Sequence, residues 1–326
     1  MRGHRILLTF AVVAWSASLA IINTLYIGSG DSDFAPIWIG ARGVLEHQNP
    51  YDLVGPGLLL SWAYPLLYPF TAILVAIPFA LVPLWLANLL FSAIGGGLLA
   101  WALTKERLAD PRLLVFLSLP FFLAGLKSQW SPLLTAAALL PGLGWAFACK
   151  PTVGLTLLLY RPSVQRFALA GLLGVVSLLL WPRWPFVWLD TITAAPHISP
   201  PIVQPWGWLL LSLLVFWRES SARLILIMAC LPQSPLIYEA VVLFLVVRTW
   251  GEAAWLWLTT FAVWWFVPIN VVDPTNVYEA LPANAPKMVL AAYLPAAVIV
   301  LRQGWMARAQ SKAKILTGSD FVTSGS

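Results

Sequence analysis

Two carboxylates, Asp31 and Asp33, come directly after the first long apolar run of the chain, which ends near residue 27. A carboxylate at the boundary between lipid and water can act as a general base toward a hydroxyl group within hydrogen-bonding distance. Either side chain can instead cap a helix that begins near Phe34, because its oxygen can accept the free N–H groups there. The pair could also share a hard cation such as Mg²⁺, but no His or further carboxylate accompanies it at ligand-like spacing. We therefore expect a reaction without a metal or other cofactor.

The elements that must hold these carboxylates are membrane spans. Of the 326 residues, 60% are hydrophobic and only 10% are charged, whereas soluble domains are about 45–50% apolar and about 25% charged. A span takes about 20 mostly apolar residues, so the chain predicts an all-α polytopic membrane protein with about 10–12 transmembrane helices. We expect one transmembrane domain over residues 1–316 and a disordered polar tail over 317–326.

Charge and cysteine placement argue against other classes. The net charge of +6 comes from basic residues scattered singly between apolar runs, a pattern typical of loops and lipid headgroup contacts rather than of nucleic-acid binding. Cys149 and Cys230 lie inside apolar stretches, which argues against a disulfide framework or a cysteine metal site. Arg2 and Arg5 precede a run that is too long for a signal-peptide core, so we expect an uncleaved first span.

Lysine and arginine near the span ends predict the orientation, since cytoplasmic loops are enriched in them. Arg2 and Arg5 predict a cytoplasmic N-terminus, and the basic residues from 302 to 314 predict a cytoplasmic C-terminus. The two larger polar loops, about residues 28–62 and 182–205, are then extracytoplasmic. Residues 64–103 are long enough for two spans that turn near Pro83, which places the basic connector 105–112 on the outer side, against the rule.

Four stretches of the chain carry a family resemblance. The run DFAPIWIGARGVLEHQNPYD, from Asp33 to Asp52, resembles the first-loop signature of glycosyltransferase family 87. Three later stretches agree with the same family in order: YPLLYPFTAILVAIPFALVP, FACKPTVGLTLLLYRP and SPLIYEAVVLFLV. The similarity covers about residues 20 to 248. The chain departs from the family where a Gly-Gln-x-Asn motif is expected, because the residues from 128 to 131 are SQWS and keep only Gln129.

The resemblance implies a membrane enzyme of the GT-C fold. Members of that family transfer a sugar, usually mannose, from a polyprenyl-phosphate donor to a lipid- or glycan-linked acceptor hydroxyl at the extracytoplasmic face, with inversion. Asp33 directly precedes Phe34 as the family's loop Asp does, so the resemblance implies that Asp33 is the general base, with Asp31 as the second candidate. The expected partners are the donor, a glycolipid or glycan acceptor and membrane lipids. The residues themselves do not distinguish mannose from other sugars.

A departing polyprenyl phosphate needs cations or hydrogen-bond donors near it. The candidates for this role are Arg42, Lys105, Arg107, Arg112, Lys150 and His197. Arg42 can instead lie along an interfacial helix with its head group in water, the connector cations can contact anionic lipid headgroups, and a lone loop histidine often has no role. Lys150 differs because it lies within an apolar run, where a cation is either functional or paired with a buried carboxylate such as Glu239.

One amide and four aromatic residues are candidates for contact with the sugar or the acceptor: Gln129, Tyr51, Tyr64, Trp38 and Trp206. The amide can hydrogen-bond a sugar hydroxyl, and aromatic rings can stack on a sugar. The alternative for Gln129 is that it caps the following helix. Since the chain has 19 Trp, each aromatic residue is equally well explained by the belt that Trp and Tyr form at membrane interfaces.

Two other functional classes fit these residues. Intramembrane charges such as Lys150, Asp273 and Glu239 also mark the pathways of transporters, so a transporter or flippase of a lipid-linked sugar is the first alternative. Inverted repeats, which would support it, are not visible in the sequence. The incomplete Gln129 motif also fits a non-catalytic membrane assembly factor that keeps the fold. A nucleotide-sugar donor is disfavoured because the sequence has no Gly-rich phosphate loop.

Overall fold

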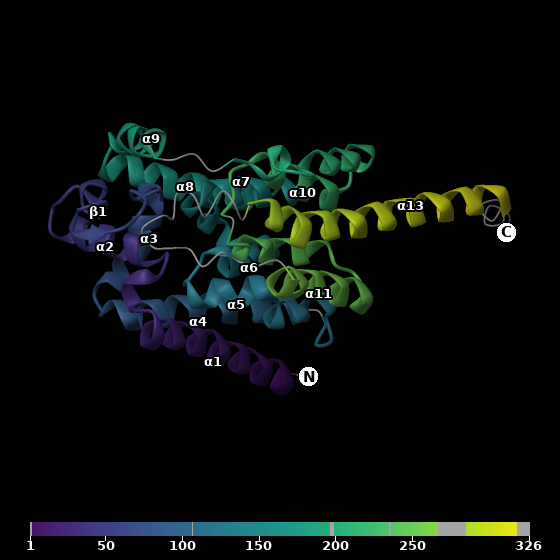
Figure 1. Cartoon of the computed structure of the whole chain (residues 1–326), viewed down its shortest axis with the longest axis horizontal. Helices are drawn as coiled ribbons and strands as arrows, with labels where there is room; N and C mark the ends of the chain where they lie inside the picture. The colour runs from purple at the N-terminus through teal and green to yellow at the C-terminus, as the bar shows by residue number, and fades with distance from the viewer. Residues whose placement is uncertain (1, 106, 196–198, 235, 267–284, 318–326) are drawn as a thin grey trace, which may run out of the picture.

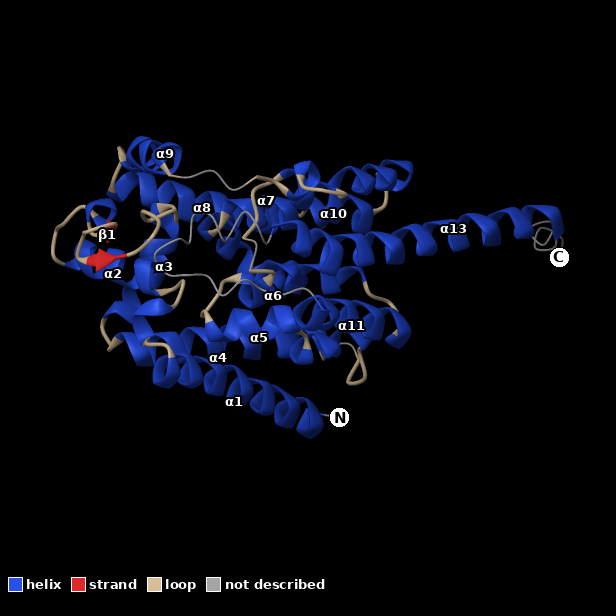
Figure 2. Ribbon diagram, viewed as in Figure 1, coloured by secondary structure: helices blue, strands red, loops and turns tan. Residues whose placement is uncertain are grey.

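The computed structural model describes residues 2–105, 107–195, 199–234, 236–266 and 285–317. Almost all regular structure in these residues is helical, as predicted, and the exception is a pair of two-residue parallel strands, β1 (Val54–Gly55) and β2 (Leu60–Ser61) (Figure 2). The α-helices are α1 (Arg2–Tyr26), α2 (Ala35–Leu45), α3 (Phe70–Ala80), α4 (Leu84–Leu103), α5 (Leu119–Leu126), α6 (Ser131–Leu139), α7 (Pro151–Tyr160), α8 (Val164–Leu180), α9 (Trp184–Ala194), α10 (Ser220–Cys230), α11 (Trp250–Phe266) and α13 (Leu294–Thr317). The 3-10 helices are η1 (Ser29–Asp31), η2 (Pro50–Asp52), η3 (Pro111–Leu117), η4 (Pro141–Cys149), η5 (Pro201–Val203), η6 (Gly207–Phe216) and η7 (Tyr238–Val246), and a π-helical turn, η9 (Val289–Tyr293), leads into α13.

In this described part, three helices are long and apolar enough to cross a bilayer: Gly3–Tyr26, Leu84–Leu103 and Ala285–Ser311. A fourth span results if α8 and α9, which are bent by 101° at the break between them, are counted as one. The molecule therefore has the helices of a membrane protein. The larger number of ten to twelve spans remains a prediction, because most other apolar runs are divided into shorter helices.

Prolines explain this division. A proline stands in the first turn of η3, α5, α6, η4 and α7. Proline is well accommodated in the first turn of a helix, where its missing N–H group has no partner, but it prevents continuation of the helix before it. A long apolar segment with regularly placed prolines thus folds as a series of short helices that change direction.

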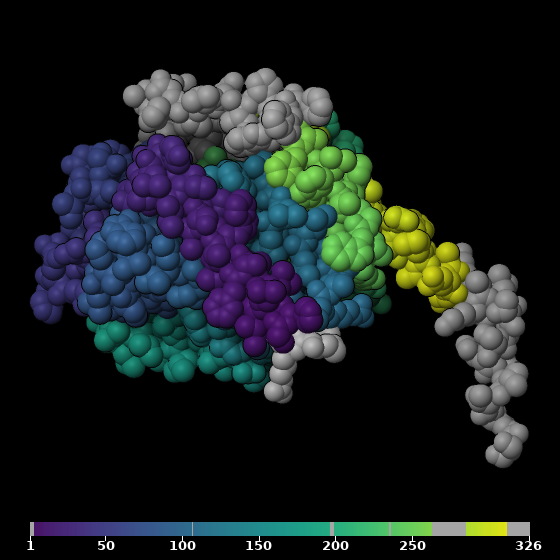
Figure 3. All heavy atoms as spheres, turned by 90° about the horizontal axis from the view of Figure 1, so that it is seen from below, coloured from purple at the N-terminus to yellow at the C-terminus, as the bar shows by residue number. Residues whose placement is uncertain are grey.

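Helices α1 and α4 pack antiparallel along one side of the body (Figures 1 and 3). Gly96 and Gly97 of α4 face α1 so closely that a Cβ at either position would meet Ser16 or Val13, which is the small-residue packing common between membrane helices. At one end, the guanidinium of Arg5 lies 4.0 Å from the ring centre of Trp101. The connector that follows α4 therefore lies beside the N-terminal end of α1.

The end of the body that holds the start of α1 also faces the C-terminus (Figure 1); we call it the terminal end. Its opposite, the loop end, carries α2, β1 and α9. The predicted second span between residues 64 and 83 is a short helix, α3, that packs beside α2, and the Nε1 of Trp38 donates to the carbonyls of Phe79 and Val82. Within residues 64–103, α4 alone runs from the loop end to the terminal end, so the prediction that the connector 105–112 lies on the same side as Asp33 is wrong.

Helices α6 and η4 form a hairpin whose two ends meet at the loop end. Gln129 precedes α6 and Lys150 follows η4, and their side chains are 3.1 Å apart, from Nζ to Oε1. At the tip of the hairpin, the Arg166 guanidinium donates to the carbonyls of Ala138 and Arg161, at 2.8 and 2.7 Å. Near the returning end, the Thr71 hydroxyl donates to the carbonyl of Ala148 at 2.6 Å. The hairpin therefore places Lys150 beside Gln129, which lies 21 positions earlier in the chain.

Helix α13 leaves the body at the terminal end and projects beyond it (Figures 1 and 3). The predicted boundary of the domain at residue 316 is close to the end of this helix at Thr317. The predicted disordered tail was 317–326: Thr317 is the last residue of α13, and the rest of the tail lies outside the described residues. The second predicted loop, 182–205, contains helices α9 and η5 and, at 196–198, further residues outside the described part.

Candidate functional site

Asp33 and Gln129 are brought together by their apolar neighbours. Phe34 follows Asp33 and stacks on Phe91 of α4, with ring centres 4.3 Å apart. Trp130 follows Gln129 and meets the same Phe91 edge to face at 5.0 Å. Both Phe34 and Trp130 are fully buried, so burial of two large rings against one residue of α4 places the two polar side chains at the same point.

Backbone and serine contacts fix the two loops further. The N–H group of Asp33 donates to the carbonyl of Lys127 at 2.9 Å. Ser128 has a left-handed backbone (φ 50), and its hydroxyl lies 3.1 Å from that of Ser92 and 3.4 Å from the carbonyl of Asn88, both on α4. The amide of Asn88 donates to the carbonyl of Ser29 at 3.1 Å. Helix α4 thus holds the first loop and the 127–129 turn through buried polar side chains as well as aromatic ones.

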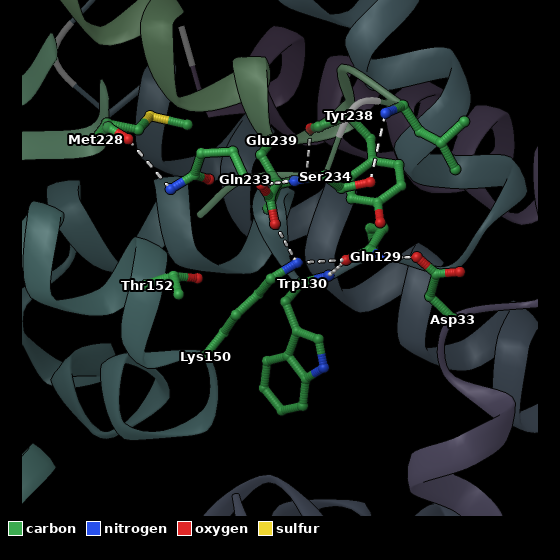
Figure 4. Close-up of polar contacts among 12 residues, drawn as sticks. Asp33, Gln129, Trp130, Lys150, Thr152, Met228, Gln233, Ser234, Tyr238 and Glu239 are labelled. Carbon is green, nitrogen blue, oxygen red and sulfur yellow. Dashed lines mark hydrogen bonds and ion pairs between the residues drawn. The ribbon is translucent and has the colours of Figure 1, made fainter. Parts of the chain in front are cut away.

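Gln129 lies between an acid and a base. Its Nε2 donates to the Asp33 carboxylate and its Oε1 accepts from the Lys150 ammonium (Figure 4). A carboxylate only accepts and an ammonium only donates, so the two partners define which way the Gln129 amide is turned. An amide in this position connects two opposite charges without neutralising either.

Lys150 forms an ion pair with Glu239, with Nζ and Oε1 2.5 Å apart. Both side chains are largely buried, with 13% and 4% of their surfaces exposed. The other oxygen of Glu239 accepts from the N–H group of Ser234 at 2.9 Å. The rings of Tyr68 and Tyr238 lie 5.8 and 5.3 Å from the ammonium, close enough for cation–π attraction. The alternative in which Lys150 pairs with buried Glu239 is therefore confirmed.

Tyr238 closes this network into a ring. Its side chain hydrogen-bonds the Asp33 carboxylate, while the next residue, Glu239, holds Lys150. Ile237, the residue before it, has a left-handed backbone (φ 60), a conformation that is unfavourable for a β-branched side chain and is retained only where surrounding structure demands it. The strained residue therefore directly precedes Tyr238 and Glu239, two neighbours of which one contacts Asp33 and the other contacts Lys150.

Burial raises the pKa of the Asp33 carboxyl above its ordinary value. The hydrogen bonds from Tyr238 and Gln129 and the charges of Lys127 and Lys150 favour the carboxylate and act in the opposite direction. Burial also raises the pKa of Tyr68 to about 12, so its hydroxyl stays protonated at neutral pH. A carboxyl group with a raised pKa is a stronger base when it is ionised, which suits proton abstraction from a hydroxyl group.

Asp31 is directed to a different partner. Its carboxylate and its carbonyl both accept from the Lys127 ammonium, the carbonyl at 3.0 Å. The helix-capping interpretation is wrong for both carboxylates, because Ser32 provides the oxygen that accepts from the N–H of Ala35, at 3.1 Å. Asp31 and Asp33 face separate partners rather than a common point. In the described ranges, no group of three His, Cys, Asp or Glu residues could hold a metal ion.

The structure separates most of the predicted phosphate ligands from Asp33. Arg42 lies half exposed on α2, where it pairs with Glu46 at 3.8 Å and covers the Trp38 ring at 5.1 Å. Lys105 and Arg107 are exposed at the terminal end, and Arg112 pairs with Asp110 there at 2.6 Å. His197 lies outside the described residues. Of this predicted set, the structure brings Lys150 to the Asp33 network.

The predicted aromatic contacts are largely structural. Trp38 is 8% exposed, and its indole N–H group donates to the carbonyl oxygens of Phe79 and Val82. Tyr51 donates to the carbonyl of Tyr68 at 3.2 Å, and its ring packs on Trp181. Tyr64 is buried at the loop end. Trp206 directly precedes η6, has a left-handed backbone and is 49% exposed, without a ring contact to the Asp33 network.

Sequence reasoning missed three residues of the site: Lys127, Tyr68 and Tyr238. The sequence contained an indication of the first two, since Lys127 lies two residues before the candidate Gln129 and Tyr68 lies in the Tyr-Pro-rich stretch of the family resemblance. Tyr238 directly precedes the carboxylate that was proposed as the partner of Lys150. Their convergence on Asp33 depends on loops far apart in the chain.

Comparisons of the chain with protein-family models, with curated proteins and with solved structures find no match.

Proposed function

We propose that the protein is a membrane glycosyltransferase that moves a sugar from a polyprenyl-phosphate donor to an acceptor hydroxyl, with Asp33 as the general base. Mannose is the sugar and GT-C the fold that the family resemblance implies. The reaction takes place at the loop end, which is the extracytoplasmic side if the basic terminal end faces the cytoplasm. The acceptor hydroxyl loses its proton to Asp33, its oxygen attacks the anomeric carbon, and the phosphate leaves from the opposite face.

The observation that carries this proposal is the setting of Asp33. Its carboxylate has a raised pKa and is oriented by Gln129 and Tyr238, and the positive charges of Lys127 and Lys150 act on it. An oriented base beside cations is the arrangement that a displacement with an anionic leaving group needs, because the base takes the proton while the cations stabilise the departing charge. Asp31, the second candidate, forms its ion pair with Lys127 and has no contact with Gln129.

The test is transfer by the purified full-length protein in lipid nanodiscs, with a radiolabelled polyprenyl-phosphate sugar and a panel of glycolipid acceptors. Asp33→Asn should abolish transfer while donor binding and the thermal midpoint remain near those of the wild type. Asp52→Asn is the matched control, since Asp52 is an exposed carboxylate of the same loop. Full activity in Asp33→Asn would refute the assignment of the base.

A transporter of a lipid-linked sugar is the alternative that the buried Lys150–Glu239 pair supports, since such pairs also mark substrate pathways. It predicts movement of the labelled lipid between leaflets with no new glycosidic product. The same nanodisc protein, reconstituted in liposomes, separates the two functions.

A further inference from the structure

Two ammonium groups lie near Asp33, and each already has a carboxylate partner. Lys127 pairs with Asp31, and Lys150 pairs with Glu239. With Asp33 itself, three carboxylates face two ammonium groups, so an anionic ligand can enter only if one lysine exchanges its partner. The two pairs differ in how easily that exchange occurs.

The Lys150–Glu239 pair is poorly suited to exchange. Only 4% of the Glu239 side chain is exposed, so a ligand that drew Lys150 away would leave a buried carboxylate without its counter-charge, which is strongly unfavourable. Lys150 is also held by Gln129 and lies between two tyrosine rings. This lysine is fixed as part of the framework.

The Lys127–Asp31 pair is suited to exchange. The Asp31 side chain is 46% exposed, so water can solvate its carboxylate when the ammonium turns away, and an exposed ion pair contributes little net stability. Lys127 has three N–H donors, of which two serve the carboxylate and carbonyl of Asp31. The backbone carbonyl of Lys127 accepts from the N–H group of Asp33, so the backbone from which this side chain extends is held beside that of the candidate base.

We propose that Lys127 is the group that binds the phosphate of the substrate, and that Asp31 is its resting-state counter-ion, which the phosphate displaces. The ligand class is a monoalkyl phosphate or phosphodiester anion carried on a lipid. This inference rests on the proposed function for the identity of the anion, and it replaces the connector cations and Arg42 as the source of the phosphate site.

The test is equilibrium binding of a polyprenyl monophosphate to the full-length protein in phosphatidylcholine nanodiscs, read by intrinsic tryptophan fluorescence, with the neutral polyprenol of equal chain length beside it. Lys127→Met should weaken phosphate binding by about tenfold or more, as expected for loss of one charge-assisted hydrogen bond. Asp31→Asn should tighten it, because the competing carboxylate is removed. Neither change should alter binding of the neutral polyprenol.

The opposite signs distinguish a binding role from a structural one, since loss of a purely structural ion pair would weaken binding in both variants. Lys127→Arg keeps the charge and should retain most of the affinity for the phosphate. If Lys127→Met fails to fold, Lys127→Arg and Asp31→Asn together test whether residue 127 binds the phosphate. Arg183→Met and Asp52→Asn are matched controls, because both remove an exposed charge at the loop end.

Two failures have different meanings. If the wild type binds the phosphate and the neutral polyprenol equally, the proposed donor class is refuted. If the wild type prefers the phosphate but Lys127→Met keeps that preference, or Asp31→Asn weakens binding, only the assignment of Lys127 is overturned.

Discussion

Replacement of Tyr238 by Phe isolates one hydrogen bond to the candidate base. The Tyr238 side chain hydrogen-bonds the Asp33 carboxylate and so lowers the pKa of Asp33, against the larger effect of burial. Phe keeps the ring beside the Lys150 ammonium and removes only the hydroxyl. The carboxylate loses stabilisation while the protonated form is hardly affected, so the pKa of Asp33 should rise further.

The size of the change follows from the type of bond. A hydrogen bond to a charged group contributes about 1.5–3 kcal/mol, and one pKa unit corresponds to about 1.36 kcal/mol. Tyr238→Phe should therefore raise the pKa of Asp33 by about one to two units. Because the base must be ionised to act, the acidic limb of kcat/KM should move to higher pH by the same amount, and activity should recover at pH values above the new limb.

The measurement is the pH profile of kcat/KM in nanodiscs. A second readout independent of catalysis is the pH dependence of carbodiimide labelling of Asp33, followed by mass spectrometry, since this reagent modifies protonated carboxyl groups. Tyr160→Phe is the matched control. Tyr160 is also a buried tyrosine, and its hydroxyl lies 3.4 Å from the carbonyl of Leu245 near the other end of η7. An unchanged midpoint for Tyr238→Phe in both assays would refute the reasoning.

Two further predictions concern the framework. Lys150→Met should lower the free energy of unfolding by about 3–5 kcal/mol, because it leaves a buried carboxylate without its counter-charge. The double variant Lys150→Met, Glu239→Leu should recover much of that stability. Thermal unfolding in detergent measures both variants, and equal midpoints for the single and double variants would contradict this prediction. The second prediction uses a protein in which the exposed Cys230 is changed to Ser and Arg107 to Cys. The new cysteine should react with a membrane-impermeant maleimide added on the side of the membrane that holds the N-terminus. Labelling from the other side would contradict the antiparallel arrangement of α1 and α4.

The place of the connector 105–112 shows where sequence reasoning failed. The run from 64 to 103 was long enough for two spans, but its prolines confine α3 to Phe70–Ala80 beside α2, and α4 alone crosses. With one crossing fewer, the basic residues Lys105 and Arg107 lie at the same end as Arg5. The expected exception to the positive-inside rule followed from counting two spans in this run, and with one crossing the connector no longer requires it.

Asp33 and Lys150 show what sequence reasoning could achieve at the site. Both stand out because a charged residue beside or within an apolar run needs an explanation that local structure does not supply. The partner of Lys150 could also be named, since Glu239 is one of few carboxylates in apolar surroundings. That Gln129 would join these residues to each other was not predictable, because its two contacts reach across 96 and 21 positions of the chain.

The sequence by itself determined that this is a helical membrane protein, because composition decides whether a chain can be solvated by water or by lipid. It also determined which residues deserved attention, because a charge in an apolar sequence is costly unless something nearby stabilises it. Only the tertiary structure decided which of those charges meet. The site forms because Phe34 and Trp130 bury their rings against α4, which brings Asp33 and Lys127 together. The hairpin of α6 and η4, whose two helices each have a proline in the first turn, then places Lys150 beside Gln129, and Tyr238 joins them from η7. Such long-range contacts are selected by packing of the whole molecule, which no local pattern of residues encodes.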